Sequence, residues 1–170
     1  MKVNNQQLLY QIASTLIPGV GDIVGKKLID YCGSPEAIFK EKKAHLLKIR
    51  GITRKTLNGI FSPKLLHRAE EEIAFIEKYS IQTMFYTKED YPTRLKQCID
   101  SPLMLYYKGN ADLNHQKIIS VVGTRSATHY GREIIEDLIA KLKEYNILVI
   151  SGLAYGIDTL AHKTSLQHGL

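Results

Sequence analysis

Two segments of this sequence share one order of features: a short apolar run, a glycine-containing loop and an amphipathic helix. The first starts at residues 117–122 (KIISVV), turns at Gly123 and continues into a helix over 131–145. The second starts at Ile147–Ile150, turns at Ser151-Gly152 and continues into a helix over 157–167. Apolar, β-branched runs separated by a helix predict parallel strands joined by a right-handed crossover. We therefore expect a parallel βαβ unit here.

Residues 62–170 are predicted to form one Rossmann-like α/β domain. Ser62-Pro63 is a helix start, and two further strands are expected over 81–86 and 103–107, with a short helix after Tyr91-Pro92. Four strands make a thin parallel sheet, and such a sheet needs helices on both faces. We interpret this α/β domain as incomplete and the chain as the N-terminal piece of a longer protein.

Residues 1–61 contain only helical signals and are predicted to form a separate all-α domain. Apolar residues at helical spacing predict a first helix around 8–16 and a second over 22–31. Ser34-Pro35-Glu36 marks a third helix start, with a capping hydroxyl followed by proline. Further helices are expected over 41–48 and 53–60.

The basic charge of the chain lies in this first domain. Residues 1–61 hold ten Lys or Arg and four Asp or Glu, whereas residues 62–170 hold thirteen of each. An excess of positive charge confined to one domain favours a polyanionic partner. A solvated lysine-rich face remains the alternative.

Composition excludes several classes of protein. No run of about 18 apolar residues is present, so neither a membrane span nor a membrane partner is predicted. Cys32 and Cys98 stand far apart and form neither a disulfide framework nor a metal-ligand spacing. We expect a cytoplasmic protein without a metal site.

Residues 16–21 (LIPGVG) form a helix-hairpin-helix signature. Backbone amides of Gly19, Val20 and Gly21 would turn outward at the start of the next helix, where the helix dipole favours a phosphate. Lys26 and Lys27 follow within two turns and would add positive charge. A purely structural hairpin is the alternative, and it is the favoured interpretation for the weaker copy at residues 47–53.

The loop after residue 122 (VGTRSATHYG, 122–131) is the stronger candidate site. Gly123 allows a tight turn, Arg125 offers a guanidinium that matches phosphate geometry, and the following helix adds backbone donors. Hydroxyls come from Thr124, Ser126 and Thr128. Helix capping by Ser126 or Thr128 is the alternative, but capping does not require Arg125, so anion binding is favoured.

The loop after residue 150 repeats this plan with Ser151, Gly152 and Gly156. If the two strands are neighbours, both loops open on one crevice at the carboxyl ends of the sheet, where such folds bind ligands. Asp158 would cap the helix or orient His162, and Lys163 would meet an anion. A packed or capping role is the favoured interpretation of His162 itself.

No catalytic constellation accompanies these loops. The sequence has no GxSxG elbow, no HExxH and no zinc-like set of cysteines and histidines. We therefore predict no catalytic residue, no cofactor and no enzymatic activity.

Three segments together resemble the DNA-processing protein A family, DprA/Smf. Residues 91–109 (YPTRLKQCIDSPLMLYYKG) resemble its YPxxL…DxPxxLYxKG segment, residues 122–131 its VGTRxxTxYG loop, and residues 151–162 its SGLAxGIDxxAH loop. The helical N-terminus resembles the family's SAM-like, helix-hairpin-helix region.

The resemblance implies a function. The family binds and protects single-stranded DNA and loads RecA onto it in natural transformation and recombination, as a homodimer with an extended Rossmann domain. By resemblance, Arg125 and its loop would hold DNA phosphates. Tyr155 stands where the family often has a basic residue, which removes one expected phosphate contact and offers base stacking instead.

Two other hypotheses remain. The chain resembles, more distantly, Rossmann-like nucleotide enzymes such as the Lonely Guy phosphoribohydrolases, in which related glycine loops hold a ribose-phosphate. In the second hypothesis, the helical domain only mediates dimerisation or binds a partner protein. The missing acid/base pair and the basic N-terminal domain favour a single-stranded-DNA binding protein.

Overall fold

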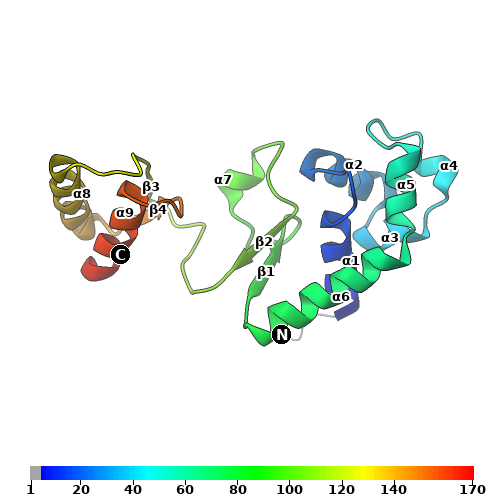
Figure 1. Cartoon of the computed structure of the whole chain (residues 1–170), viewed down its shortest axis with the longest axis horizontal. Helices are drawn as coiled ribbons and strands as arrows, with labels where there is room; N and C mark the ends of the chain where they lie inside the picture. The colour runs from blue at the N-terminus through cyan, green and yellow to red at the C-terminus, as the bar shows by residue number, and fades with distance from the viewer. Residues whose placement is uncertain (1–4) are drawn as a thin grey trace. The chain divides into compact units, whose positions relative to one another are not determined.

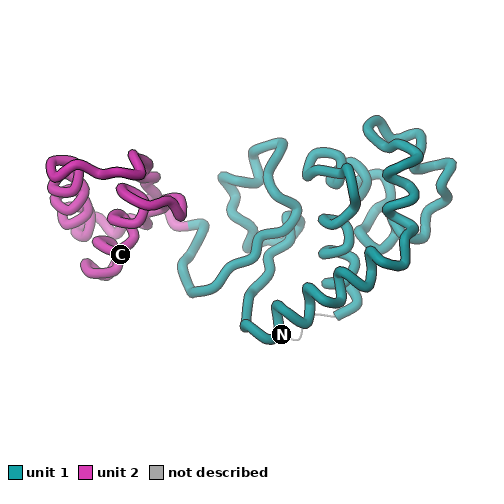
Figure 2. Tube along the Cα trace, in the orientation of Figure 1, with its two compact units in different colours: residues 1–114 teal, residues 115–170 magenta. Residues whose placement is uncertain are grey.

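The computed structural model describes residues 5–170 and divides the chain into two compact units. Unit 1 comprises residues 1–114 and unit 2 residues 115–170 (Figure 2). The domain boundary predicted between residues 61 and 62 falls inside unit 1, and it stays a prediction. Residues 1–4, which begin the predicted helical domain, lie outside the described residues.

The described part of unit 1 begins with six helices, close to the positions that the sequence predicts (Figure 1). The predicted cap at Ser34 is confirmed, because its hydroxyl oxygen accepts a hydrogen bond from the amide of Ala37 at 3.1 Å. Ser62 precedes a helix as predicted, but its hydroxyl makes no cap bond. The helices are α1 (Asn5–Thr15), α2 (Asp22–Cys32), α3 (Pro35–Lys40), α4 (Lys43–Leu46), α5 (Arg54–Ile60) and α6 (Pro63–Lys78).

The strands of unit 1 differ from the predicted single parallel sheet. β1 (Gln82–Phe85) and β2 (Met104–Tyr107) pair antiparallel, with Phe85 opposite Met104, and form a two-stranded sheet of their own. The short helix α7 (Thr93–Lys96) lies in the connection between them. The prediction of one four-stranded parallel sheet was wrong, because apolar runs reveal strands but not their direction or partners.

One apolar cluster holds unit 1 together. It contains buried residues from all of α1 to α6 and from β1 and β2, and it extends from Leu8 to Met104. Ile12, Leu28 and Leu103 are among its least exposed members. Burial of each such side chain contributes about 1.5–3 kcal/mol to the free energy of folding. Removal of residues 1–61 would therefore open this core.

Unit 2 is the predicted parallel βαβ unit followed by one more helix. β3 (Ile118–Val121) pairs in parallel with β4 (Leu148–Ser151), and Val121 stands opposite Ser151. The crossover is α8 (His129–Leu142) with a 3-10 turn, η1 (Lys143–Tyr145). The last helix, α9 (Ile157–His168), packs against α8 and β4. The order of strands and helices in this unit is as predicted.

The core of unit 2 is small: Val121, Ile135, Ile139, Ile157 and Ala161 are buried. In α8 and η1, Ile135 is buried, whereas Ile134 and Tyr145 are exposed. The two strands are apolar in sequence but mostly half-buried, and Ile150 is exposed. Each strand has one partner among the described residues, so much of the sheet stays accessible.

None of the helices in residues 5–170 could span a membrane. The longest, α6, has 16 residues, whereas a bilayer requires about 20 apolar residues. Within the same residues, no three His, Cys, Asp or Glu side chains are grouped so that they could hold a metal ion.

Candidate functional site

The two glycine loops of unit 2 leave the same edge of the β3–β4 sheet and lie side by side. The register puts the last residues of the two strands, Val121 and Ser151, opposite each other. The Ser151 hydroxyl donates to the Val121 carbonyl at 2.6 Å, and the Ile157 amide donates to the Thr124 carbonyl at 3.1 Å. The strand carboxyl ends therefore carry a joined pair of loops, at the position where α/β folds bind ligands.

Two glycines make this close approach possible. Gly156 has φ +84°, and a Cβ there would collide with the Thr124 carbonyl oxygen and lie 2.5 Å from the carbonyl carbon of Arg125. A Cβ on Gly123 would lie 2.6 Å from Ile157. The backbone of the first loop thus fills the space that a side chain at Gly156 would need, and the Ile157 side chain at the start of α9 fills the space beside Gly123.

Most of the predicted hydroxyls are engaged within the loops. Thr128 caps α8, because its Oγ1 accepts from the Gly131 amide at 3.1 Å. Thr124 Oγ1 accepts from the Ser126 amide at 3.2 Å, and Ser151 is bound as described above. These three hydroxyls shape the loops, and the capping alternative that the sequence left open for Thr128 is the one observed.

In the first loop, Arg125 and Ser126 are predicted residues whose side chains remain available. Both are exposed, and within residues 5–170 neither side chain is paired with another residue. Because Gly156 lies against the Arg125 carbonyl, the backbone of Arg125 is fixed while its guanidinium faces solvent. This combination of a fixed backbone and an unpaired guanidinium suits bidentate binding of a phosphate.

Exposed apolar and aromatic side chains surround the loops. Tyr155 is 83% exposed, Tyr130 71% and Leu153 99%. Tyr155 is a site residue predicted from the sequence, whereas Tyr130 and Leu153 are not. Tyr130 is the second residue of α8, and an aromatic residue at a helix start beside a glycine loop is the signal that would have identified it. Flat, exposed rings beside a cation are the features with which proteins hold unpaired bases.

Asp158 has neither of the roles predicted for it, whereas His162 has a structural role, which the sequence favours. His162 Nε2 donates to the Gly152 carbonyl at 2.9 Å and is not oriented by Asp158. Asp158 is buried at the start of α9, makes no cap bond, and its Oδ1 has no hydrogen-bond partner. Lys163 is exposed one residue after His162. The Asp158 carboxylate lies close to the backbone of Gly152, since a Cβ at Gly152 would lie 2.5 Å from Asp158 Oδ2.

The predicted helix-hairpin-helix site belongs to unit 1. Gly19 turns the hairpin with φ +77°, and Gly21 precedes α2 without a side-chain cap. The first residue of α2 is Asp22, whose carboxylate accepts from the Leu103 amide at 2.8 Å. A carboxylate at a helix start competes with a bound phosphate for the same dipole.

Lys26 does not stand free beside this hairpin. Its ammonium donates to Ser101 Oγ at 2.6 Å and to the Ile99 carbonyl at 3.0 Å, both on a distant segment of the chain. Lys27 and Val20 make no such contact, and Lys27 is exposed. Of the two predicted lysines, Lys27 is thus available beside the hairpin, whereas Lys26 is bound to the segment 99–101.

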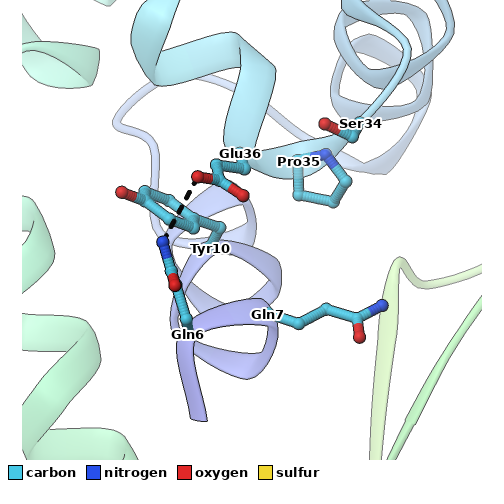
Figure 3. Close-up of a pocket in the computed structure, with 6 residues that line it drawn as sticks. All are labelled: Gln6, Gln7, Tyr10, Ser34, Pro35 and Glu36. Atoms are coloured by element: carbon cyan, nitrogen blue, oxygen red, sulfur yellow. Dashed lines mark hydrogen bonds between the residues drawn. The ribbon is translucent and has the colours of Figure 1, made fainter. Parts of the chain in front are cut away.

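A pocket between α1 and α3 contains none of the predicted site residues. It has a volume of about 310 Å³ and is lined by polar side chains, and the Gln6 amide nitrogen lies 3.3 Å from Glu36 Oε1 (Figure 3). Glu36 also pairs with Lys40 at 2.6 Å. The described residues that line this pocket include a carboxylate and no free cation, which makes the lining unsuited to a phosphate.

The geometry defines an α/β protein whose candidate site is a pair of glycine loops at the carboxyl ends of parallel strands. A model of the family described as DNA recombination-mediator protein A matches residues 82–170, just over half of the chain. The chain belongs to this family, and the resemblance to DprA/Smf drawn from the sequence is confirmed.

Curated relatives agree with this assignment. The DNA processing protein DprA of Streptococcus pneumoniae is 43% identical over 79 residues, which cover 46% of this chain and 28% of that protein. DprA of Bacillus subtilis is 32% identical over 63% of this chain and 35% of the relative. Protein Smf of Synechocystis is 26% identical over 96% of this chain and 42% of the relative. The chain thus spans less than half the length of these relatives.

A solved structure extends the similarity to both units. The X-ray structure of DprA from Streptococcus pneumoniae matches with a TM-score of 0.61 and 26% sequence identity. The match covers 99% of this chain and 56% of that chain.

Proposed function

We propose that this chain is a non-enzymatic single-stranded-DNA binding protein, and that its DNA site is the pair of glycine loops in unit 2. The observation that carries the proposal is Arg125, an exposed and unpaired guanidinium on a backbone fixed by the neighbouring loop. Membership of the DNA recombination-mediator protein A family supports a role with DNA.

In the proposed mechanism, one phosphate lies against Arg125 and the adjacent Ser126 hydroxyl. Gly123, Gly152 and Gly156 contribute indirectly, because they allow the two loops and α9 to pack closely and so hold Arg125 and Ser126 in place. Tyr155 and Tyr130 stack on neighbouring bases, each contact contributing about 1–3 kcal/mol regardless of base identity. Binding would therefore be tolerant of sequence and selective for strands with unpaired bases.

The hairpin of unit 1 is proposed as a supplementary contact. Gly19–Gly21 and Lys27 would hold a further phosphate, with Asp22 weakening that contact. The whole protein, by its relationship to DprA/Smf, would protect incoming single-stranded DNA, act as a homodimer and pass the strand to the RecA recombinase.

The alternative of a nucleotide-processing enzyme receives less support from the crevice. His162 already donates to a backbone carbonyl, and Asp158 is buried at the start of α9. Neither group is arranged as an acid/base pair over an open site. Hydrolysis of nucleoside monophosphates by the wild-type chain would favour the enzyme hypothesis.

The direct test is titration of labelled oligo-dT by fluorescence anisotropy with wild type and Arg125→Ala. Loss of one charge-assisted phosphate contact costs about 1.5–3 kcal/mol, so the affinity should fall about 10- to 150-fold. The melting temperature should stay unchanged, because Arg125 is exposed and unpaired. Arg125→Lys should recover part of the loss, since lysine lacks the bidentate geometry.

Lys143→Ala is the matched control. Lys143 is an exposed cation of unit 2 in the 3-10 turn after α8, at the opposite end of that helix from Arg125. If both variants lose affinity equally, the effect is one of net charge and the loops are not the DNA site. A large drop in the melting temperature of Arg125→Ala would instead identify a structural residue.

A further inference from the structure

We propose that a second ligand site lies in unit 1, in the hollow between α2 and the segment 96–101, and that it binds a nucleotide. The hollow has a volume of about 530 Å³, within the range of small-molecule pockets. It lies outside the glycine loops, and two of its lining lysines belong to the predicted hairpin motif. It is lined by Ile23, Lys26, Lys27, Asp30, Tyr86, Lys96, Gln97, Cys98, Ile99 and Ser101.

The two sides of the hollow are held together by Lys26. This half-buried ammonium donates to Ser101 Oγ and to the Ile99 carbonyl, and lies 5.8 Å from the centre of the Tyr86 ring. Ser101 is itself buried. Lys26 therefore fixes the segment 99–101 against α2, which makes the hollow a preformed feature of the unit.

Two further lysines supply the positive charge for a ligand. Lys27 and Lys96 are exposed, line the hollow from opposite sides, and have no partner among the described residues. The carboxylate in the lining, Asp30, interacts with the Tyr86 hydroxyl, and this contact partly occupies it. Two unpaired ammonium groups at one opening suit a phosphate, which lysine binds as a point charge.

The rest of the wall is apolar. Ile99 is 77% exposed and Ile23 39% exposed, and both line the hollow together with the Tyr86 ring. Exposed isoleucines beside a ring and unpaired ammonium groups match a ligand that has a flat, apolar part and an anionic part. A nucleotide has both, whereas inorganic phosphate or an acidic peptide has only the charge.

The nucleotide could come from two sources: a free nucleoside monophosphate, or one unit of a single DNA strand. If the ligand is one unit of a DNA strand, unit 1 takes part in the proposed DNA binding, and this version of the inference rests on the proposed function. The side chain of Cys98 is exposed and lines the hollow, so its accessibility reports directly on occupancy.

The experiment measures the rate at which N-ethylmaleimide alkylates Cys98 in the 170-residue chain, read by mass spectrometry of the peptide that contains it. The additions are dTMP, oligo-dT, inorganic phosphate or poly-glutamate. At about ten times its dissociation constant, a ligand in the hollow should slow alkylation about tenfold. We expect this protection from dTMP, from oligo-dT or from both.

Lys27→Glu/Lys96→Glu should abolish the protection. Lys55→Glu/Lys64→Glu carries the same change of charge on exposed lysines of unit 1 outside the hollow, and it should keep the protection. Protection by phosphate or poly-glutamate as strong as that by dTMP would overturn the nucleotide assignment, as would equal loss in the two double variants.

The two proposals fail separately. If oligo-dT binds by anisotropy but neither oligo-dT nor dTMP protects Cys98, the hollow is not a nucleotide site and the loop proposal stands. If dTMP protects Cys98 while oligo-dT shows no binding, the hollow is a site for free nucleotide and the DNA-binding function is wrong.

Discussion

At the scale of single residues, the site of unit 2 depends on where side chains are absent. Gly156 combines a positive φ with a backbone oxygen in the place of its missing Cβ, whereas Gly169 has φ +75° and open space around it. Gly169 has ψ 29° and lies in the left-handed helical region, whereas Gly156 has ψ −125° and lies outside it, so both conformation and collision oppose a side chain at Gly156.

Gly156→Ala should lower the free energy of unfolding by much more than Gly169→Ala. A non-glycine residue at positive φ costs about 1–2 kcal/mol, and this is the whole expected effect at Gly169. At Gly156 the Thr124 carbonyl must also move, so we expect a loss above about 3 kcal/mol, at the upper end of strained backbone positions. Urea unfolding of both variants measures the difference. Equal losses would show that the loops are not in contact.

The burial of Tyr86 in unit 1 can be tested through the pH dependence of stability. Burial, with Asp30 nearby, raises the pKa of Tyr86 from 10.0 to about 12. A raised pKa favours the protonated phenol in the folded state, so this stabilisation is fully present below pH 10 and is lost as the pH rises toward 12.

Stability of the wild type should therefore fall between pH 10 and 12, and Tyr86→Phe should reduce that fall. Burial also raises the pKa of Tyr91 and of Tyr106, so part of the fall should remain in the variant. Thermal melts across this range measure the effect. An identical pH profile for Tyr86→Phe would place the Tyr86 hydroxyl in solvent.

Local signals were enough to predict some site residues but not others. The cap at Ser34 and the exposed Arg125 follow from neighbours in the sequence. The anchoring of Lys26 could not be predicted, because its partner Ser101 lies 75 residues away. The side-by-side loops of unit 2 were predictable only on condition that β3 and β4 are neighbours.

At the scale of elements, the start of α2 decides whether the hairpin can hold a phosphate. Asp22 places a negative charge on the first residue of the helix, and its Oδ1 accepts from the Leu103 amide. An amide side chain would keep the acceptor oxygen and remove the charge.

Asp22→Asn should raise the affinity for oligo-dT about two- to fivefold, because a charge at a helix end contributes about 0.3–1 kcal/mol. Anisotropy titration measures the change, with Asp112→Asn, an exposed acid of the same unit, as the control for net charge. An unchanged affinity in Asp22→Asn would assign the hairpin a structural role alone.

Element positions were predicted better than element partners. The helices and strands lie within a few residues of the predicted ranges, because hydrophobic periodicity is a local property. Antiparallel pairing of β1 with β2 depends on how Phe85, Leu103 and Met104 pack into the cluster of unit 1, which no local pattern reveals.

At the scale of the whole molecule, the chain presents cations in both units: the loop with Arg125 in unit 2, and the lysines of α2 and α7 in unit 1. A single strand that contacts several phosphates releases bound counterions, so its binding weakens steeply with salt. The number of phosphates contacted can therefore be read from the salt dependence.

The most direct test of the central claim is the slope of log affinity against log salt concentration for oligo-dT, in wild type and in Arg125→Ala. Wild-type affinity should fall about tenfold or more between about 50 and about 200 mM salt. The slope should be shallower by about 0.7 in Arg125→Ala, the value for one phosphate contact on a single strand. A salt-independent affinity, or the same slope and affinity in the variant, would contradict DNA binding at the glycine loops.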